Sequence, residues 1–257
     1  MSRSNPHEHG APNPAVRYFE WHGGQGVVRY YDKTAKKDVD LPVPPDFRFM
    51  LLDQLGSIRG FNKSTNSGIY SNEIRDTRQD VLVVKASKGA ITLAEGVYKV
   101  IKPQVTSKAV GGQFVANCYI AVKTNGTNEL KIASLRLKGA ALGAWMEFCK
   151  TNRAALYKKA IAITGSVDDQ NGGIHFKTPT FKTVEISPES DAQALALDKE
   201  LQEYLASYLK RTRRDQADAA AAQPGGDHPG SISGDPGPGD DVGAGGPSAM
   251  TDDDIPF

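Results

Sequence analysis

The amino-acid sequence predicts a mainly β body followed by a disordered acidic tail, and two features of the chain lead to this fold class. From Arg17 to about Ile186, short runs rich in Val, Ile, Tyr, Phe and Thr alternate with turn residues, a pattern typical of strands. After about Arg214 the chain is crowded with Gly, Pro, Ala and Asp, and such a segment buries too little apolar surface to offset its ordering entropy. We therefore expect a flexible N-terminus at 1–14, a folded body at 15–212, a disordered linker at 213–249 and an acidic tip at 250–257.

Eight segments of the body have the composition of strands. They are residues 26–31, 47–52, 81–86, 98–105, 113–123, 129–138, 158–167 and 174–186. Asn125-Gly126 and Asn171-Gly172-Gly173 lie between such runs. Both are expected to form hairpin turns, because Asn and Gly tolerate the positive φ that those turns need.

One expected helix interrupts the strands at Gly139 to Asn152, where Leu142, Trp145, Met146 and Cys149 recur at helical spacing. A helix between the third and fourth strands matches the oligonucleotide-binding (OB) fold, a barrel of five strands. On this template the core strands are 81–86, 113–123 and 129–138 before the helix, and 158–167 and 174–186 after it.

A second helix is expected to begin at Ser187-Pro188-Glu189. Ser can cap a helix, Pro suits its first turn, and Glu complements the helix dipole. One apolar stripe follows, made of Leu197, Leu201, Tyr204, Leu205 and Tyr208. The stripe indicates a helix packed on the body, and a dimer seam is the alternative.

Charge is divided unevenly along the chain, although the formal net charge is only +1. All 31 Lys and Arg lie at or before Arg214, together with 21 of the 30 acids, so the body carries +10. Nine aspartates follow, which give the tail −9. Such asymmetry indicates that the body binds a polyanion.

Several classes of function lack their usual signals. The sequence contains no phosphate-binding loop, no zinc-protease motif and no nucleophile elbow, so we expect no catalytic residue, no bound metal and no cofactor. Cys118 and Cys149 have no ligand spacing and are expected to be reduced and buried. The polar N-terminus has no apolar run that would make a signal peptide or membrane span, so we expect a soluble, cytoplasmic protein in a bacterial or viral setting.

Basic residues interleaved with aromatic residues form the expected binding site, because cations follow phosphates while flat rings stack on unpaired bases. We expect Phe47, Phe49, Phe114, Trp145 and Phe148 to lie in the core. Tyr119 and Phe61 are the leading candidates for stacking. Phe176 and Phe181 cannot both face the nucleic acid in an unbroken strand, and a break in register at Pro179 leaves the choice open. The expected DNA-binding residues are Arg59, Phe61, Lys63, Tyr70, Arg75, Tyr98, Lys99, Lys102, Lys108, Tyr119, Lys123, Arg136, Lys138, Phe176, Lys177 and Lys182.

The last six residues are the most specific motif in the chain: Asp252, Asp253, Asp254, Ile255, Pro256 and Phe257. They resemble the C-terminal tip of bacterial single-stranded DNA-binding proteins. In such a tip the terminal residue offers a ring for an apolar pocket and a carboxylate for a cation, while the acids steer toward a basic rim. The resemblance implies that these six residues dock replication and repair proteins of the host or the phage.

Residues 41–82, which include Phe61 and the run Gly68-Ile69-Tyr70-Ser71-Asn72-Glu73, are similar to bacteriophage single-stranded DNA-binding proteins of the type found in Enterobacter phage Enc34. This resemblance implies an OB barrel that binds single-stranded DNA without sequence preference in replication, recombination or repair. Two alternatives stay open, a recombination mediator that anneals strands and a metal-dependent nuclease. The oligomeric state is not predicted.

Overall fold

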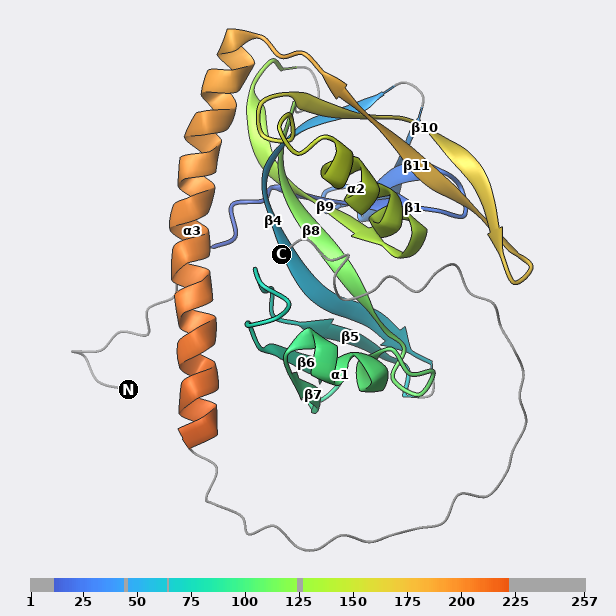
Figure 1. Ribbon diagram of the computed structural model, residues 1–257, viewed down its shortest axis with the longest axis vertical. Coiled ribbons are helices and arrows are strands. Elements are labelled where there is room, and N and C mark those ends of the chain that lie inside the picture. The colour runs from blue at the N-terminus through green and yellow to red at the C-terminus, as the bar shows by residue number, and fades with distance from the viewer. Residues whose placement is uncertain (1–11, 44–45, 64, 124–126, 222–257) are drawn as a thin grey trace, which may run out of the picture.

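The computed structural model of the protein describes residues 12–43, 46–63, 65–123 and 127–221 (Figure 1). It confirms a mainly β protein, in which eleven strands form one open mixed sheet and three helices pack against it. The predicted N-terminal segment, the turn at Asn125-Gly126, most of the linker and the acidic tip lie outside the described residues.

Three long antiparallel strands form the centre of the sheet. They are β4 (Phe47–Asn62), β8 (Gly112–Lys123) and β9 (Leu130–Lys138). Strand β4 pairs with β8 from Met50 to Gly60, with a bulge between Leu51 and Asp53. The bulge exchanges the faces to which odd and even residues of β4 point, because side chains alternate along a strand.

Shorter strands continue the sheet on both sides of this centre. On one side lie β5 (Ser67–Ser71), β6 (Leu82–Ala86) and β7 (Thr92–Gly96), followed by helix α1 (Tyr98–Val105). On the other side lie β1 (Arg17–His22), β2 (Val27–Asp32) and β3 (Lys37–Pro42). Strand β1 pairs with β9 in parallel, whereas the other ladders are antiparallel, and the order is β3-β2-β1-β9-β8-β4-β5-β6-β7.

A helix and a hairpin follow β9. They are α2 (Gly139–Thr151), β10 (Ala160–Asn171) and β11 (Ile174–Val184). The predicted hairpin turn is confirmed, with φ of 53° at Gly172 and 82° at Gly173. Strand β10 pairs with the start of β4, and the Lys177 N–H of β11 donates to the Gly23 carbonyl at 2.7 Å. These contacts bring β11 against the turn that follows β1.

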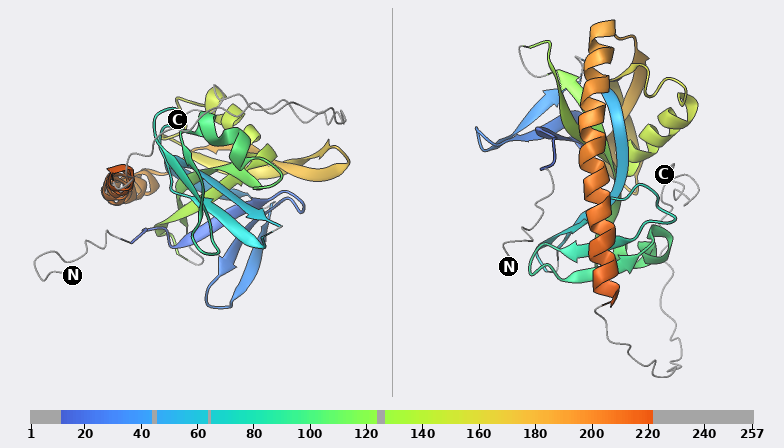
Figure 2. Two further views of the ribbon diagram at one scale, coloured as in Figure 1. Left: turned by 90° about the horizontal axis from the view of Figure 1, so that it is seen from below. Right: turned by 90° about the vertical axis from the view of Figure 1, so that its left-hand side faces the viewer.

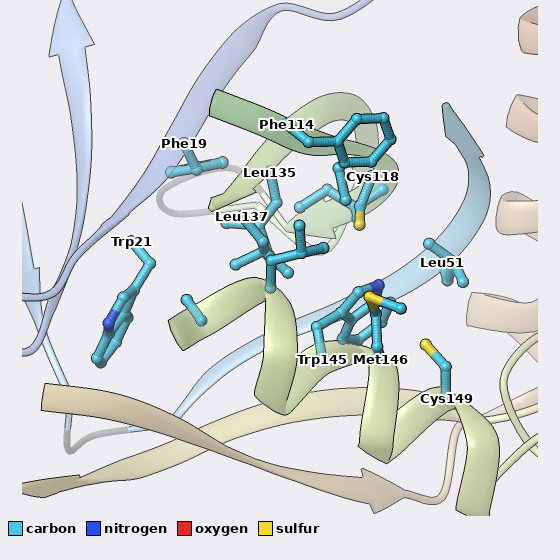
Figure 3. Close-up of a cluster of buried hydrophobic side chains, with 14 of the residues drawn as sticks. Phe19, Trp21, Leu51, Phe114, Cys118, Leu135, Leu137, Trp145, Met146 and Cys149 are labelled. Carbon is cyan, nitrogen blue, oxygen red and sulfur yellow. The ribbon is translucent and has the colours of Figure 1, made fainter. Parts of the chain in front are cut away.

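The main core lies between the sheet and α2 (Figure 3). Trp145 of α2 is fully buried there, and Phe49 and Phe114 are buried with it, as predicted. Phe47 and Phe148 are partly buried and pack against the same cluster. The predicted helix at 139–152 is therefore confirmed, and its apolar face covers one side of the sheet.

Helix α3 (Pro188–Ala221) covers part of the opposite side and runs past both the central strands and the β5–β7 strands (Figures 1 and 2). The Ser187 hydroxyl accepts the Ser190 N–H at 3.2 Å, so the predicted cap is present. Leu201, Tyr204 and Leu205 are buried against the sheet. The predicted stripe thus packs on its own chain, the first of the two interpretations.

Four predictions about secondary structure are corrected. Residues 98–105 form helix α1, because Tyr98, Ile101 and Val105 share one buried helical face despite their strand-like composition. The first central strand is β4, since 81–86 pairs only with β5 and β7. Strand 47–52 extends to Asn62. The linker does not begin at 213, because α3 continues through an Ala-rich segment without Gly or Pro.

Candidate nucleic-acid interface

The sheet has two chemically different faces. Along β8, Phe114, Cys118 and Ile120 point into the main core, so the alternate residues Asn117 and Tyr119 point to the other face. We call this second side the outer face. Helix α3 covers one end of it through a separate apolar cluster. The rest of the outer face includes the polar residues Ser57, Gln113 and Asn117 and several cations, together with apolar residues such as Val83 and Val115.

Four side chains form a row across the outer face, which we call the basic row. The ladders place Gln113 of β8 opposite Arg59 of β4, Arg59 opposite Tyr70 of β5, and Tyr70 opposite Lys85 of β6. Residues directly opposite in antiparallel strands have Cβ atoms about 4.5–5.5 Å apart and share a face. Tyr70 therefore lies between two cationic residues in the row, and all three side chains are partly exposed.

A second cation approaches Arg59 from β9. The guanidinium carbon of Arg136 lies 5.0 Å from the ring centroid of Tyr18. Burial lowers the pKa of Arg136 below its usual value, and the positive charge of Arg59 lowers it further. The Nε atoms of Arg59 and Arg136 are buried without a hydrogen-bond partner. Two partly buried guanidinium groups therefore lie on this face, on the strands that flank β8, with Arg59 opposite Gln113 and Arg136 opposite Asn117.

The carboxyl group of Glu73 lies beside these arginines at the edge of α3. Its Oε2 atom accepts the Tyr119 hydroxyl at 2.7 Å, and its backbone N–H donates to the Tyr208 hydroxyl at 2.9 Å. Burial raises the pKa of Glu73, and the hydrogen bond from Tyr119 opposes that shift. The contacts fix Glu73 between β8 and α3.

Two predicted stacking residues are wrong. Tyr119 lies on the outer face, as its alternation predicts, but α3 covers it and leaves 1% of the residue exposed. Tyr98 is 5% exposed, because its ring packs 4.8 Å from the Phe114 ring, between centroids, on the core side. Neither ring can stack on a base in this fold.

Phe61 and Lys63 lie where β4 ends beyond the basic row, and the side chain of Phe61 is 53% exposed. The remaining cations of α1 and the turn after it lie apart from the row. Helix α1 packs on the core side of the sheet, and the Lys102 ammonium lies 5.8 Å from the Tyr98 ring centroid there. The exposed residues of this group are Lys99 and Lys108.

Four further cations bind neighbouring side chains within the protein. Arg75 forms an ion pair with Asp53 at 2.6 Å, and Lys138 forms one with Glu20. The Lys123 ammonium donates to Asn128 at 3.2 Å, near the end of the sheet that α3 covers. Lys177 forms an ion pair with Asp168 at 2.6 Å on the β10–β11 hairpin. Three of these contacts are ion pairs, and their cations keep part of their surface exposed: 47% for Arg75, 50% for Lys138 and 38% for Lys177.

The choice between Phe176 and Phe181 is resolved in part. The ring of Phe181 lies 5.2 Å from the Trp145 ring and 5.6 Å from the Phe148 ring, between centroids, so it belongs to the core. Phe176 is partly exposed on the β10–β11 hairpin, and Lys182 is exposed nearer its base. Phe176 is therefore the residue of this pair that a ligand can reach.

Sequence reasoning did not identify Lys85 and Tyr18 as site residues. Lys85 could have been found within the predicted strand 81–86, because Leu82 and Val84 are apolar and leave Lys85 on the opposite face. Tyr18 belongs to β1, which was not predicted as a strand. Its place beside Arg136 depends on the parallel pairing of β1 with β9, which no local pattern indicates.

No family model, no curated protein and no solved structure matches this chain. Within the described residues there is no group of three or more His, Cys, Asp or Glu placed to hold a metal ion. In the same part of the chain, no helix combines the length and apolar character needed to cross a membrane. The six residues of the predicted docking tip lie outside this part.

Proposed function

We propose that the protein binds single-stranded DNA without sequence preference, and that the basic row on the outer face is the centre of the binding site. The observation that carries this proposal is the register that places Tyr70 between Arg59 and Lys85 on three adjacent strands. No ion pair among the described residues includes either cation. Single strands require this combination, because their phosphates need cations and their bases offer flat faces for stacking.

The topology supports an OB core made of β4, β8, β9, β10 and β11. Strand β4 pairs with both β8 and β10, and α2 lies between the third and fourth of these strands. Strand β1 lies against β9, and the hydrogen bond from Lys177 to Gly23 joins β11 to the turn after β1. Strand β1 therefore lies between β9 and β11, and this additional strand distinguishes the protein from a barrel of five strands alone.

OB folds bind oligonucleotides on the face of their second and third strands and with the loops between strands 1 and 2 and strands 4 and 5. In the proposed core these regions are β8 with β9, the segment 63–111, and the β10–β11 turn. Most of the predicted site residues belong to these three regions. Arg136 and Lys138 lie on β9, Tyr70 lies in the long segment, and Phe176 follows the turn.

The proposed cellular role follows from the two resemblances and the division of charge. A body of +10 binds single strands during phage replication, recombination and repair, in the cytoplasm of the bacterial host. The tip, Asp252 to Phe257, recruits replication and repair proteins. Binding of this kind needs neither a cofactor nor a catalytic residue.

A titration of fluorescent 30-nucleotide oligo(dT) and a 30-base-pair duplex at two salt concentrations tests the proposal. Single strands should bind more tightly than duplex. In a plot of log binding constant against log salt concentration, each phosphate neutralised should contribute about −0.7 to the slope. Tyr70→Ala should weaken binding roughly 5-fold to 150-fold, from about 1–3 kcal/mol of stacking, without changing that slope. Tyr157→Ala is the matched control, since Tyr157 is an exposed tyrosine outside the basic row. Equal affinity for duplex, or equal behaviour of the two variants, contradicts the proposal.

A further inference from the structure

The strongest remaining feature of the outer face is the pair of arginines, Arg59 and Arg136. They come from strands on either side of β8, and both Nε atoms are buried without a hydrogen-bond partner. Two carboxyl groups lie nearby, but Glu20 pairs with Lys138 and Glu73 accepts the Tyr119 hydroxyl. Among the described residues, no carboxylate lies within ion-pair distance of either guanidinium.

This arrangement is unfavourable for the protein by itself. A buried charge is costly unless it is paired, and two like charges repel each other more strongly where solvent is excluded. Burial and the charge of Arg59 both lower the pKa of Arg136, whereas the charges of Glu20, Glu73 and Tyr18 oppose that shift. Tyr18 offers partial compensation through its ring face, which holds the Arg136 guanidinium in place. An anion between the two arginines would remove the repulsion.

We propose that Arg59 and Arg136 form a subsite for one phosphate group. Guanidinium groups suit this ligand, because their planar fork donates two parallel hydrogen bonds to phosphate oxygens. As part of the proposed function, the ligand is one phosphodiester of the bound single strand. The subsite fixes the position of that phosphate on the sheet, so that the following base reaches Tyr70 in the basic row.

Inorganic phosphate tests the subsite without DNA. The melting temperature of the full chain is measured in phosphate and in chloride at equal ionic strength and pH. Phosphate at ten times its Kd should raise the melting temperature by about 3–5 °C. Part of any increase comes from general exclusion of phosphate from protein surfaces, so variants decide the result.

Arg136→Gln and Arg59→Gln should each lose most of the phosphate-dependent increase. In chloride the melting temperature of each variant is the baseline from which its own phosphate-dependent increase is measured. Lys150→Gln is the matched control, since Lys150 is exposed on α2, which packs on the other face. Arg136→Lys keeps the charge and the fold and should also lose most of the increase, because Lys lacks the fork. An equal increase in all the variants overturns the subsite.

Oligo(dT) distinguishes a bound strand from free phosphate as the ligand. If both arginines hold one phosphate, the losses in affinity of Arg59→Gln and Arg136→Gln should not add in the double variant. Additive losses overturn the shared phosphate. Phosphate stabilisation without DNA binding would keep the subsite and refute the proposed function. DNA binding that depends on Tyr70 would support the proposed function. If phosphate then had no effect and the losses were additive, the subsite would be refuted.

Discussion

The indole Nε1 of Trp145 donates a hydrogen bond to Oε1 of Gln54 over 2.6 Å, and this bond joins α2 to β4 inside the main core. Trp145 is fully buried and Gln54 is 9% exposed. The Cys118 thiol lies 3.6 Å from the same oxygen. One amide oxygen therefore serves both polar groups in an otherwise apolar region.

Gln54→Leu should destabilise the protein, because it leaves the indole N–H buried without an acceptor. The expected loss in the free energy of unfolding is about 1–3 kcal/mol. Urea denaturation followed by tryptophan fluorescence measures it. Gln79→Leu, at an exposed glutamine, is the control and should change stability little. A similar loss in both variants would show that the acceptor is not important.

Neither cysteine should react in the native state. Burial raises the pKa of Cys118 well above its usual value and raises the pKa of Cys149 to about 12. The thiolate is the reactive form, so both groups stay protonated at pH 8. Titration with a chromogenic disulfide reagent should detect no rapid reaction before denaturant is added and two thiols afterwards. Rapid labelling of one thiol without denaturant would contradict the packing around α2.

Glu73→Gln should stabilise the protein more at pH 7.5 than at pH 4.5. Burial raises the pKa of Glu73 in the folded state, so the folded state binds more protons there than the unfolded state. This carboxyl group therefore lowers stability as pH rises through the window between its unfolded and folded pKa values. Urea denaturation of both proteins at the two pH values measures the difference. A stability gain that grows as pH falls would mean that the pKa shift has the opposite sign.

Deletion of Phe257 should abolish capture of replication and repair proteins while leaving affinity for oligo(dT) nearly unchanged. The deletion removes the aromatic ring and moves the chain-terminal carboxylate to Pro256, so that ring and carboxylate no longer belong to one residue. Affinity capture from a bacterial host lysate, with the bound proteins identified by mass spectrometry, measures the effect. Ile232→Ala in the linker is the control. Capture that survives the deletion would contradict the tip assignment.

Local patterns predicted the parts of the fold that depend on neighbours in the sequence. The helix at 139–152, the turn at Gly172-Gly173 and the cap at Ser187 were all correct. Strands β3 and β7 were missed because they are short and carry exposed polar or charged residues. Their pairing depends on neighbouring strands rather than on composition.

The site was less predictable because it depends on what covers each face. Alternation placed Tyr119 on the outer face, but only the packing of α3 decides that its ring is buried. Arg59 and Tyr70 were both identified, whereas their position side by side required the β4–β5 register. A sequence indicates which residue types could bind a strand, and the register decides which of them meet.

The parallel pairing of β1 with β9 has a consequence for how the chain folds during synthesis. Arg17 pairs with Ala133, so β1 leaves the ribosome long before its partner exists. At roughly 5–20 residues per second, the delay is on the order of 5–20 s. Throughout that interval Phe19 and Trp21 lack the core that later buries them. The nascent chain therefore exposes an aromatic strand with an unpaired edge, the kind of segment to which chaperones bind and through which nascent chains aggregate.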